Sequence, residues 1–195
     1  MSDGFRSRVA AALTAPLDGP LTARFVAPLV TALVARADEG PELADALAEV
    51  SAALARVGVP PGRQYVLLAG ERAAERGPAR ARELRARLEL PVLVHDPART
   101  GFVAGRLPGG AALELDDELR EAEAIVVLAA LGRSPAAAWS AATVVCPDAC
   151  SARTRVAFAA ARSGDAAADW ELSRHCERAA RLDLLVWWDA AGGGR

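Results

Sequence analysis

The sequence contains no lysine: all 23 basic residues among its 195 residues are arginines. No side chain can therefore form a Schiff base, act as an amine base or tether a cofactor through an amine. Aromatic residues make up 5% of the chain and apolar residues 52%, so the core must consist mainly of Ala, Leu and Val. A chain of this length buries roughly 70% of its extended-state surface, which is enough for a sizeable core.

Strong net charge and long apolar segments are also absent. The formal net charge is -2, the isoelectric point is near 5.8, and acidic and basic residues are interspersed. This pattern disfavours nucleic acid and anionic membrane surfaces as partners. The longest apolar stretches, residues 124–131 and 184–188, are far shorter than the ~20 residues of a membrane span. The first residues lack the apolar core of a signal peptide, so we expect a cytoplasmic protein.

Short β-branched apolar runs alternate with Ala-rich segments of helical period, a pattern typical of βαβ units. We therefore predict an α/β fold of Rossmann-like type, with a mainly parallel sheet and helices on both faces, in a single domain covering residues 1–195. The predicted strands are residues 29–35, 64–69, 91–95, 112–115, 124–128 and 182–188. The predicted helices are residues 41–57, 71–88, 116–123, 152–162 and 169–181.

Glycine and proline refine these boundaries. The helix within residues 71–88 is expected to begin only near Pro78, because proline is favoured in the first turn. The Gly-rich residues 101–110 predict a loop or a hairpin turn. The first 20 residues are expected to be peripheral to the domain.

Residues 90–132 contain, in order, a strand ending in His95-Asp96, glycines at 105, 109 and 110, an apolar strand, an acidic segment and a strand ending in glycine. This order resembles the N-terminal domain of the nickel-pincer lactate racemase family. Residues 41–72 are similar to that family's long helix and the strand after it, and the similarity spans roughly residues 30–195. The resemblance implies a Rossmann-like domain that acts on a small 2-hydroxy acid.

The sequence departs from the family at the positions that carry its chemistry. The resemblance implies an Asp-x-Thr-Arg-Pro anion motif where residues 37–41 read Ala-Asp-Glu-Gly-Pro. It implies a catalytic histidine where Glu71 stands, followed by the arginine that Arg72 matches. The cofactor-bearing lysine is implied in a loop that has Thr143, and the nickel-ligating and second catalytic histidines have no match. We therefore expect no bound cofactor and a catalytically degenerate domain.

Four polar residues at predicted strand ends are the candidate site, because ligands bind open α/β sheets at the carboxyl ends of strands. Glu71 and His95 are the candidate catalytic residues, as carboxylate base and imidazole proton shuttle. Arg72 and Asp96 are the candidate residues for binding a small carboxylate or another anion. The alternatives are structural: a local Glu71–Arg72 ion pair, and a turn formed by Asp96 before Pro97.

Cys146, Cys150, His175 and Cys176 include the nitrogen and sulfur donors that zinc prefers. An adjacent His-Cys pair within a predicted helix is an uncommon half of a zinc site. Buried thiols in a reducing compartment are therefore favoured, and we predict no metal site.

Three functional hypotheses follow from these observations. The first is a degenerate racemase-like domain that serves as a binding or partner module. The second is an isomerase of the same superfamily in which Glu71, Arg72 and His95 converge in a reworked pocket. The third is a structural subunit of a homo- or hetero-oligomer.

Overall fold

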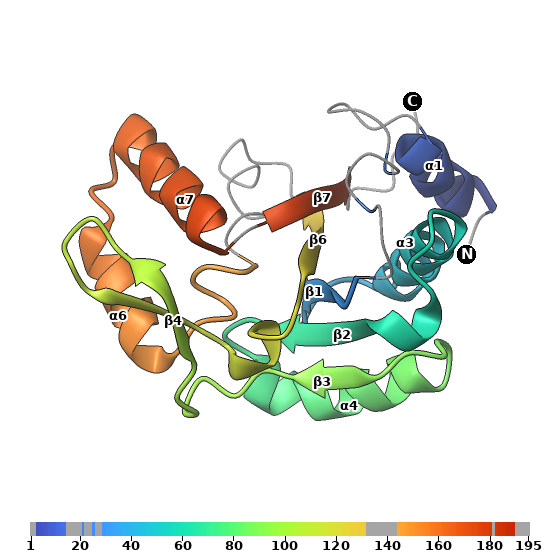
Figure 1. Cartoon of the computed structure of the whole chain (residues 1–195), viewed down its shortest axis with the longest axis horizontal. Helices are drawn as coiled ribbons and strands as arrows, with labels where there is room; N and C mark the ends of the chain where they lie inside the picture. The colour runs from blue at the N-terminus through green and yellow to red at the C-terminus, as the bar shows by residue number, and fades with distance from the viewer. Residues whose placement is uncertain are drawn as a thin grey trace.

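The computed structural model describes residues 3–14, 21, 25, 29–131, 144–180 and 182–189 (Figure 1). Thr143 and the last residue of the predicted helix at 169–181 lie outside these residues. Within them, no helix combines the length and apolarity needed to traverse a bilayer.

A sheet of five parallel strands forms the centre of the structure, in the order β3-β2-β1-β6-β7. Thr31, the first residue of β1, is paired with the first residue of β2 on one side and of β6 on the other. The predicted parallel α/β fold is confirmed. The strands are β1 (Thr31–Arg36), β2 (Gln64–Ala69), β3 (Val92–Val94), β6 (Ala124–Leu131) and β7 (Leu182–Asp189).

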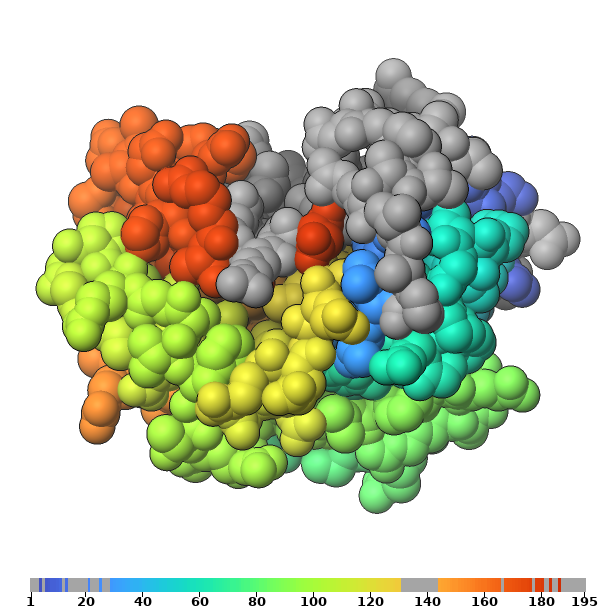
Figure 2. Space-filling model, viewed as in Figure 1, coloured from blue at the N-terminus to red at the C-terminus, as the bar shows by residue number. Residues whose placement is uncertain are grey.

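Helices cover both faces of this sheet. They are α1 (Asp3–Thr14), α3 (Leu43–Arg56), α4 (Ala73–Arg85), α6 (Ala152–Ala161) and α7 (Ala166–Ala180). Successive strand residues face opposite sides: Leu33 and Ala35 pack with α1, α3 and α4, whereas Ala32 and Val34 pack with α6 and α7. The space-filling view places α7 on one side of the molecule and α3 and α4 on the other (Figure 2).

Helix α3 follows its sequence pattern closely. Leu47, Val50 and Leu54, spaced along one face, are fully buried against the sheet. Gly58, just beyond the helix, has a φ of 105°, a conformation that glycine adopts without steric cost. The next amide, that of Val59, donates to the carbonyl of Leu54 at 2.9 Å and closes the helix end.

Helix α4 begins at Ala73, so the prediction that it begins near Pro78 is wrong. Pro78 lies inside the helix and cannot donate a backbone hydrogen bond to the carbonyl of Ala74. Close packing compensates for that loss: a Cβ on Gly77 would lie 2.4 Å from Cγ1 of Val94 on β3. Glycine at this position lets the helix approach the strand.

The predicted helix at residues 116–123 is also wrong. Only the 3₁₀ turn η2 (Asp117–Leu119) forms there. The carboxylate of Asp116 accepts a hydrogen bond from the Glu118 amide at 2.9 Å, which stabilises a tight turn. The segment then enters β6 without room for a longer helix.

The Gly-rich segment predicted as a loop or turn contains a strand. Strand β4 (Phe102–Arg106) pairs antiparallel with β5 (Ala112–Leu115), and the turn between them includes Gly110 at a φ of 83°. We call β4 and β5 the hairpin. The hairpin lies outside the main sheet and packs on the face covered by α6 and α7.

Gly101 allows the hairpin to close. A Cβ on Gly101 would lie 1.7 Å from the backbone oxygen of Leu115, which cannot move without breaking the hairpin.

We expect Gly101→Ala to lower the free energy of unfolding by about 1–3 kcal/mol, as overpacking does. Chemical denaturation would measure the change. Gly109→Ala is the matched control, because its Cβ would meet nothing within 4 Å. Equal stability of the two variants would contradict this account.

Candidate functional site

The carboxyl edge of the sheet has a topological switch point between β1 and β6. From β1 the strand order runs to β2 and β3 in one direction, and from β6 to β7 in the other. Crevices at such points are where open α/β sheets bind ligands. Here the edge carries Arg36 at the end of β1, Glu39 in the turn that follows, and Asp148 from a distant segment.

Arg36 and Asp148 form an ion pair, with 2.5 Å between Nε and Oδ2. The Arg36 side chain is 31% exposed and that of Asp148 is 10% exposed. Arg155 also holds the segment that contains Asp148. Its guanidinium donates to the carbonyls of Asp148 at 2.5 Å and Cys150 at 3.2 Å. The amide of Gly70, at the end of β2, also donates to the Asp148 carbonyl at 3.3 Å.

Two carboxyl groups at this edge have raised pKa values. Burial raises the pKa of Asp148 above its ordinary value, and the attraction of Arg36 offsets only part of that effect. The negative charge of Glu71 adds to the increase. Burial likewise raises the pKa of Glu39, although the Ala130 amide donates to this carboxyl at 3.3 Å. At a given pH, both groups hold a proton more often than ordinary carboxyls do.

His95 lies directly after β3 and is only 2% exposed. Its Nδ1 contacts the carboxylate of Asp116, and its Nε2 lies 3.0 Å from the carbonyl oxygen of Cys150. Burial alone would raise the pKa of Asp116, but hydrogen bonds with His95 and the Glu118 amide hold that pKa below its ordinary value. Both ring nitrogens are therefore engaged within the protein. His95 joins β3 to the hairpin and to the segment before α6.

The other candidate residues face solvent. Glu71 and Arg72 are exposed in the turn between β2 and α4. Asp96 is exposed, and its carboxylate accepts from the Ala98 amide at 2.9 Å, as a turn residue does. Across the described ranges, no hydrogen bond or ion pair joins Glu71 or Arg72 to His95. The catalytic and binding roles of these four residues stay predictions.

The three cysteines lie together in the core. Cys146, Cys150 and Cys176 are buried as thiols, and the Cys146 thiol is hydrogen-bonded to the other two. The hydrogen bond with Cys150, supported by burial, raises the pKa of Cys146, so the thiol is unreactive. His175 instead contacts the Arg106 carbonyl at 2.6 Å. In the part of the chain that the structure describes, no three His, Cys, Asp or Glu residues are arranged to hold a metal.

Arg36, Glu39, Asp148 and Arg155 were absent from the sequence prediction. A signal existed for the first two, since the charged run Arg36-Ala37-Asp38-Glu39 follows a predicted strand. No local signal existed for Asp148 and Arg155: Asp148 is 112 residues from its partner Arg36, and Arg155 is 85 residues from Gly70, whose carbonyl it contacts.

Comparison with solved structures identifies a similar fold. The chain aligns with the lactate racemase apoprotein from Thermoanaerobacterium thermosaccharolyticum with a TM-score of 0.68 over 94% of this chain. The fold resembles half of a lactate racemase. This chain covers 49% of that structure, and the two sequences are 13% identical. No family model matches the chain, and no curated protein matches it in sequence. The predicted resemblance to lactate racemase therefore holds for the fold.

The described residues do not fit the nickel-pincer nucleotide that the racemase resemblance implies. No lysine is available to hold it, and His95 is already engaged on both ring nitrogens. The ring of His175 is directed to the Arg106 carbonyl. We therefore derive no step through that group.

The contact between His95 and Asp116 predicts a pH-dependent contribution to stability. We expect Asp116→Asn to lower the free energy of unfolding by about 2 kcal/mol near neutral pH, because it removes a charge-assisted hydrogen bond to a buried ring. The depressed pKa of Asp116 means that this contribution is present above the ordinary carboxyl pKa of about 4. It is lost as the pH falls through the lower folded-state value.

Urea denaturation of both proteins at neutral and acidic pH would measure this difference. Asp117→Asn is the matched control, since Asp117 is 53% exposed and pairs with Arg120 at the surface. Such pairs contribute about 0–1 kcal/mol. A difference between wild type and Asp116→Asn that stays constant with pH would refute the assignment.

Proposed function

We propose that this chain is a racemase-like binding module that lacks racemase chemistry and binds a small carboxylate at the carboxyl edge of its sheet. The observation that carries the proposal is the use of His95 as a buried structural link rather than as an accessible proton shuttle. The absence of any lysine supports it independently. The fold is retained while the groups needed for the chemistry are missing.

Arg36 and Arg72 both lie near Gly70 at the proposed binding edge. The Cγ atom of Arg36 lies 3.7 Å from the position that a Cβ on Gly70 would take. The aliphatic part of the Arg36 side chain therefore lies beside the turn between β2 and α4, which includes Arg72. Arg72 is exposed at the start of α4, where helix amide groups also favour negative charge. A guanidinium matches a carboxylate with two parallel hydrogen bonds. We assign Arg72 as the main contact because Arg36 already pairs with Asp148.

Calorimetric titration with L-lactate tests the binding proposal. We expect Arg72→Ala to weaken binding at least about tenfold, the loss typical of a charge-assisted hydrogen bond. Arg63→Ala is the matched control, because Arg63 is an exposed arginine just before β2, at the opposite edge of the sheet. Unchanged affinity in Arg72→Ala would count against the site. Conversion of L-lactate to D-lactate by the purified chain would overturn the loss of racemase chemistry.

A second candidate function is an isomerase that acts on a small 2-hydroxy acid with different residues. The raised pKa values of Glu39 and Asp148 at the switch point favour it, because carboxyl groups with perturbed pKa values can exchange protons with a substrate. In this proposal Arg36 orients the Asp148 carboxyl, and the substrate carboxylate contacts Arg72.

Hydrogen–deuterium exchange at the substrate carbon separates the two candidates. An isomerase would incorporate deuterium at C2 of lactate in D₂O, as followed by proton NMR, and Glu39→Gln would abolish that exchange. A binding module would leave the C2 proton in place. Glu42→Gln is the control, since Glu42 lies at the start of α3 and has no part in the proposed chemistry.

A further inference from the structure

The Asp148 carboxyl is a buried acidic group beside the binding edge proposed above. Its side chain is 10% exposed, and its Oδ2 lies 2.5 Å from Nε of Arg36. The segment around it is held through the backbone, because the Asp148 carbonyl accepts from the Gly70 amide at 3.3 Å and from Arg155. These backbone hydrogen bonds do not depend on the charge of the side chain. The carboxyl can therefore gain or lose a proton while the segment stays in place.

Charged groups face this carboxyl from several elements. Arg36 on β1 and Arg155 on α6 favour its ionised form, whereas Glu71 in the turn after β2 disfavours it. Burial outweighs the two arginines and raises the pKa of Asp148 above its ordinary value. Arg36 also favours the ionised form of a second carboxyl, that of Glu39. The positive charge of Arg36 is thus opposed by carboxyls of the protein as long as these are ionised.

The turn after β2 lies within electrostatic reach of Asp148. Glu71 in this turn is exposed, yet its negative charge contributes to the raised pKa of Asp148. Arg72, the proposed contact of the ligand, is the next residue in the same turn. A carboxylate bound by Arg72 would bring another negative charge to this turn. It would repel the ionised form of Asp148, as Glu71 does, but not the protonated form.

We propose that the site takes up a proton together with its carboxylate ligand, and that Asp148 holds this proton. The inference rests on the proposed function, because it concerns the same carboxylate site. The proton comes from solvent and adds to the Asp148 carboxylate, so no other bond forms or breaks. Protonated Asp148 also opposes less of the charge of Arg36, which adds to the attraction for the anion.

The direction of the pH dependence follows from linkage. A ligand that favours protonated Asp148 is bound more tightly when Asp148 is already protonated. Affinity should therefore rise as the pH falls through the pKa that Asp148 has in the complex. It should level off below the pKa that Asp148 has in the free protein.

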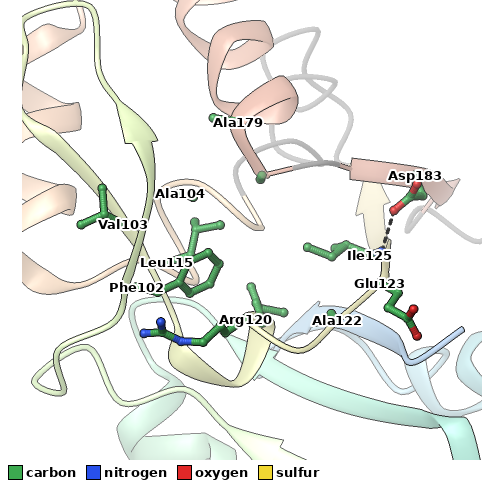
Figure 3. A pocket seen from close by; sticks show the side chains of 12 residues that line it. Phe102, Val103, Ala104, Leu115, Arg120, Ala122, Glu123, Ile125, Ala179 and Asp183 are labelled. Carbon is green, nitrogen blue, oxygen red and sulfur yellow. Dashed lines mark hydrogen bonds between the residues drawn. The ribbon is translucent and has the colours of Figure 1, made fainter.

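The pocket at the amino edge of the sheet is a poor alternative site for the anion. It lies between the hairpin, the end of α7 and the first residues of β6 and β7 (Figure 3). Arg120 is the only basic residue among its described lining residues, and its Nη2 already donates to Asp117 at 2.6 Å. The Arg120 guanidinium also lies over the Phe102 ring, 5.4 Å from its centroid. Titration with a carboxylate should therefore report on the carboxyl edge.

Calorimetric titration of the full chain with L-lactate at several pH values tests the coupling. We expect the affinity to rise at least about fivefold as the pH falls, the lower end of typical coupling between linked sites. A range from about pH 8 to about pH 5 keeps lactate ionised, because it lies above the ordinary carboxyl pKa of about 4. Titrations in two buffers of different ionisation enthalpy give the number of protons taken up, which should be positive.

Asp148→Asn is the decisive variant, because its side chain is neutral at every pH. We expect it to bind L-lactate at least about fivefold more tightly than wild type at about pH 8, with a flat pH profile and no proton uptake. Asp38→Asn is the matched control, since Asp38 is an exposed carboxyl in the turn after β1. It should keep the wild-type profile. Glu71→Gln leaves Asp148 in place but removes a like charge, so it should move the rise in affinity to lower pH.

The outcomes separate the coupling from the proposed function. Lactate binding that does not change with pH, or proton uptake that persists in Asp148→Asn, would overturn the coupling alone. A profile flattened equally in Asp38→Asn would do the same. No lactate binding at any pH would overturn the proposed function as well. The amide NMR spectrum shows whether Asp148→Asn is folded; if it is not, an unshifted profile in Glu71→Gln would overturn the coupling.

Discussion

The carbonyl groups of Asp148 and Cys150 hold the carboxyl edge of this fold together. The Asp148 carbonyl accepts from Gly70 and Arg155, and the Cys150 carbonyl accepts from His95 and Arg155. Buried carbonyls without donors are costly, so these donors must stay in place when the chain is folded. Through them β2, β3 and the start of α6 are joined to one short segment.

This network engages residue types that are common in active sites. The His95 imidazole is used at both nitrogens to satisfy acceptors, and Asp116 is its partner. Arg155 uses the several donors of one guanidinium to bind carbonyls in place of an anionic ligand. Arg72 faces solvent and is the residue that the proposed carboxylate would contact.

The two edges of the sheet differ in physical character. The carboxyl edge is polar and internally hydrogen-bonded, and the pKa values of the half-buried Glu39 and the buried Asp148 are raised there. The amino edge contains a pocket between the hairpin, the end of α7 and the first residues of β6 and β7. A fold similar to that of lactate racemase thus supports both arrangements. The fold alone does not assign a reaction to either edge.

The local sequence predicted the helices and strands that carry a regular pattern of apolar residues. The apolar runs of β2 and β6 and the face of α3 were predictable, because burial of a periodic apolar stripe needs no knowledge of the partner. The absence of lysine excluded amine chemistry without any structure. His95 was predicted as the last residue of a strand, and it lies directly after β3.

Tertiary structure decided the remaining features. Strand β4 has a glycine and a bulge instead of a clear alternation, and it forms because it pairs with β5 and packs beside α7. Helix α4 continues through Pro78 because Gly77 packs on β3. Arg36 and Asp148 are 112 residues apart, so only folding brings them together. The raised pKa of Asp148 follows from its burial, which no local pattern of residues encodes.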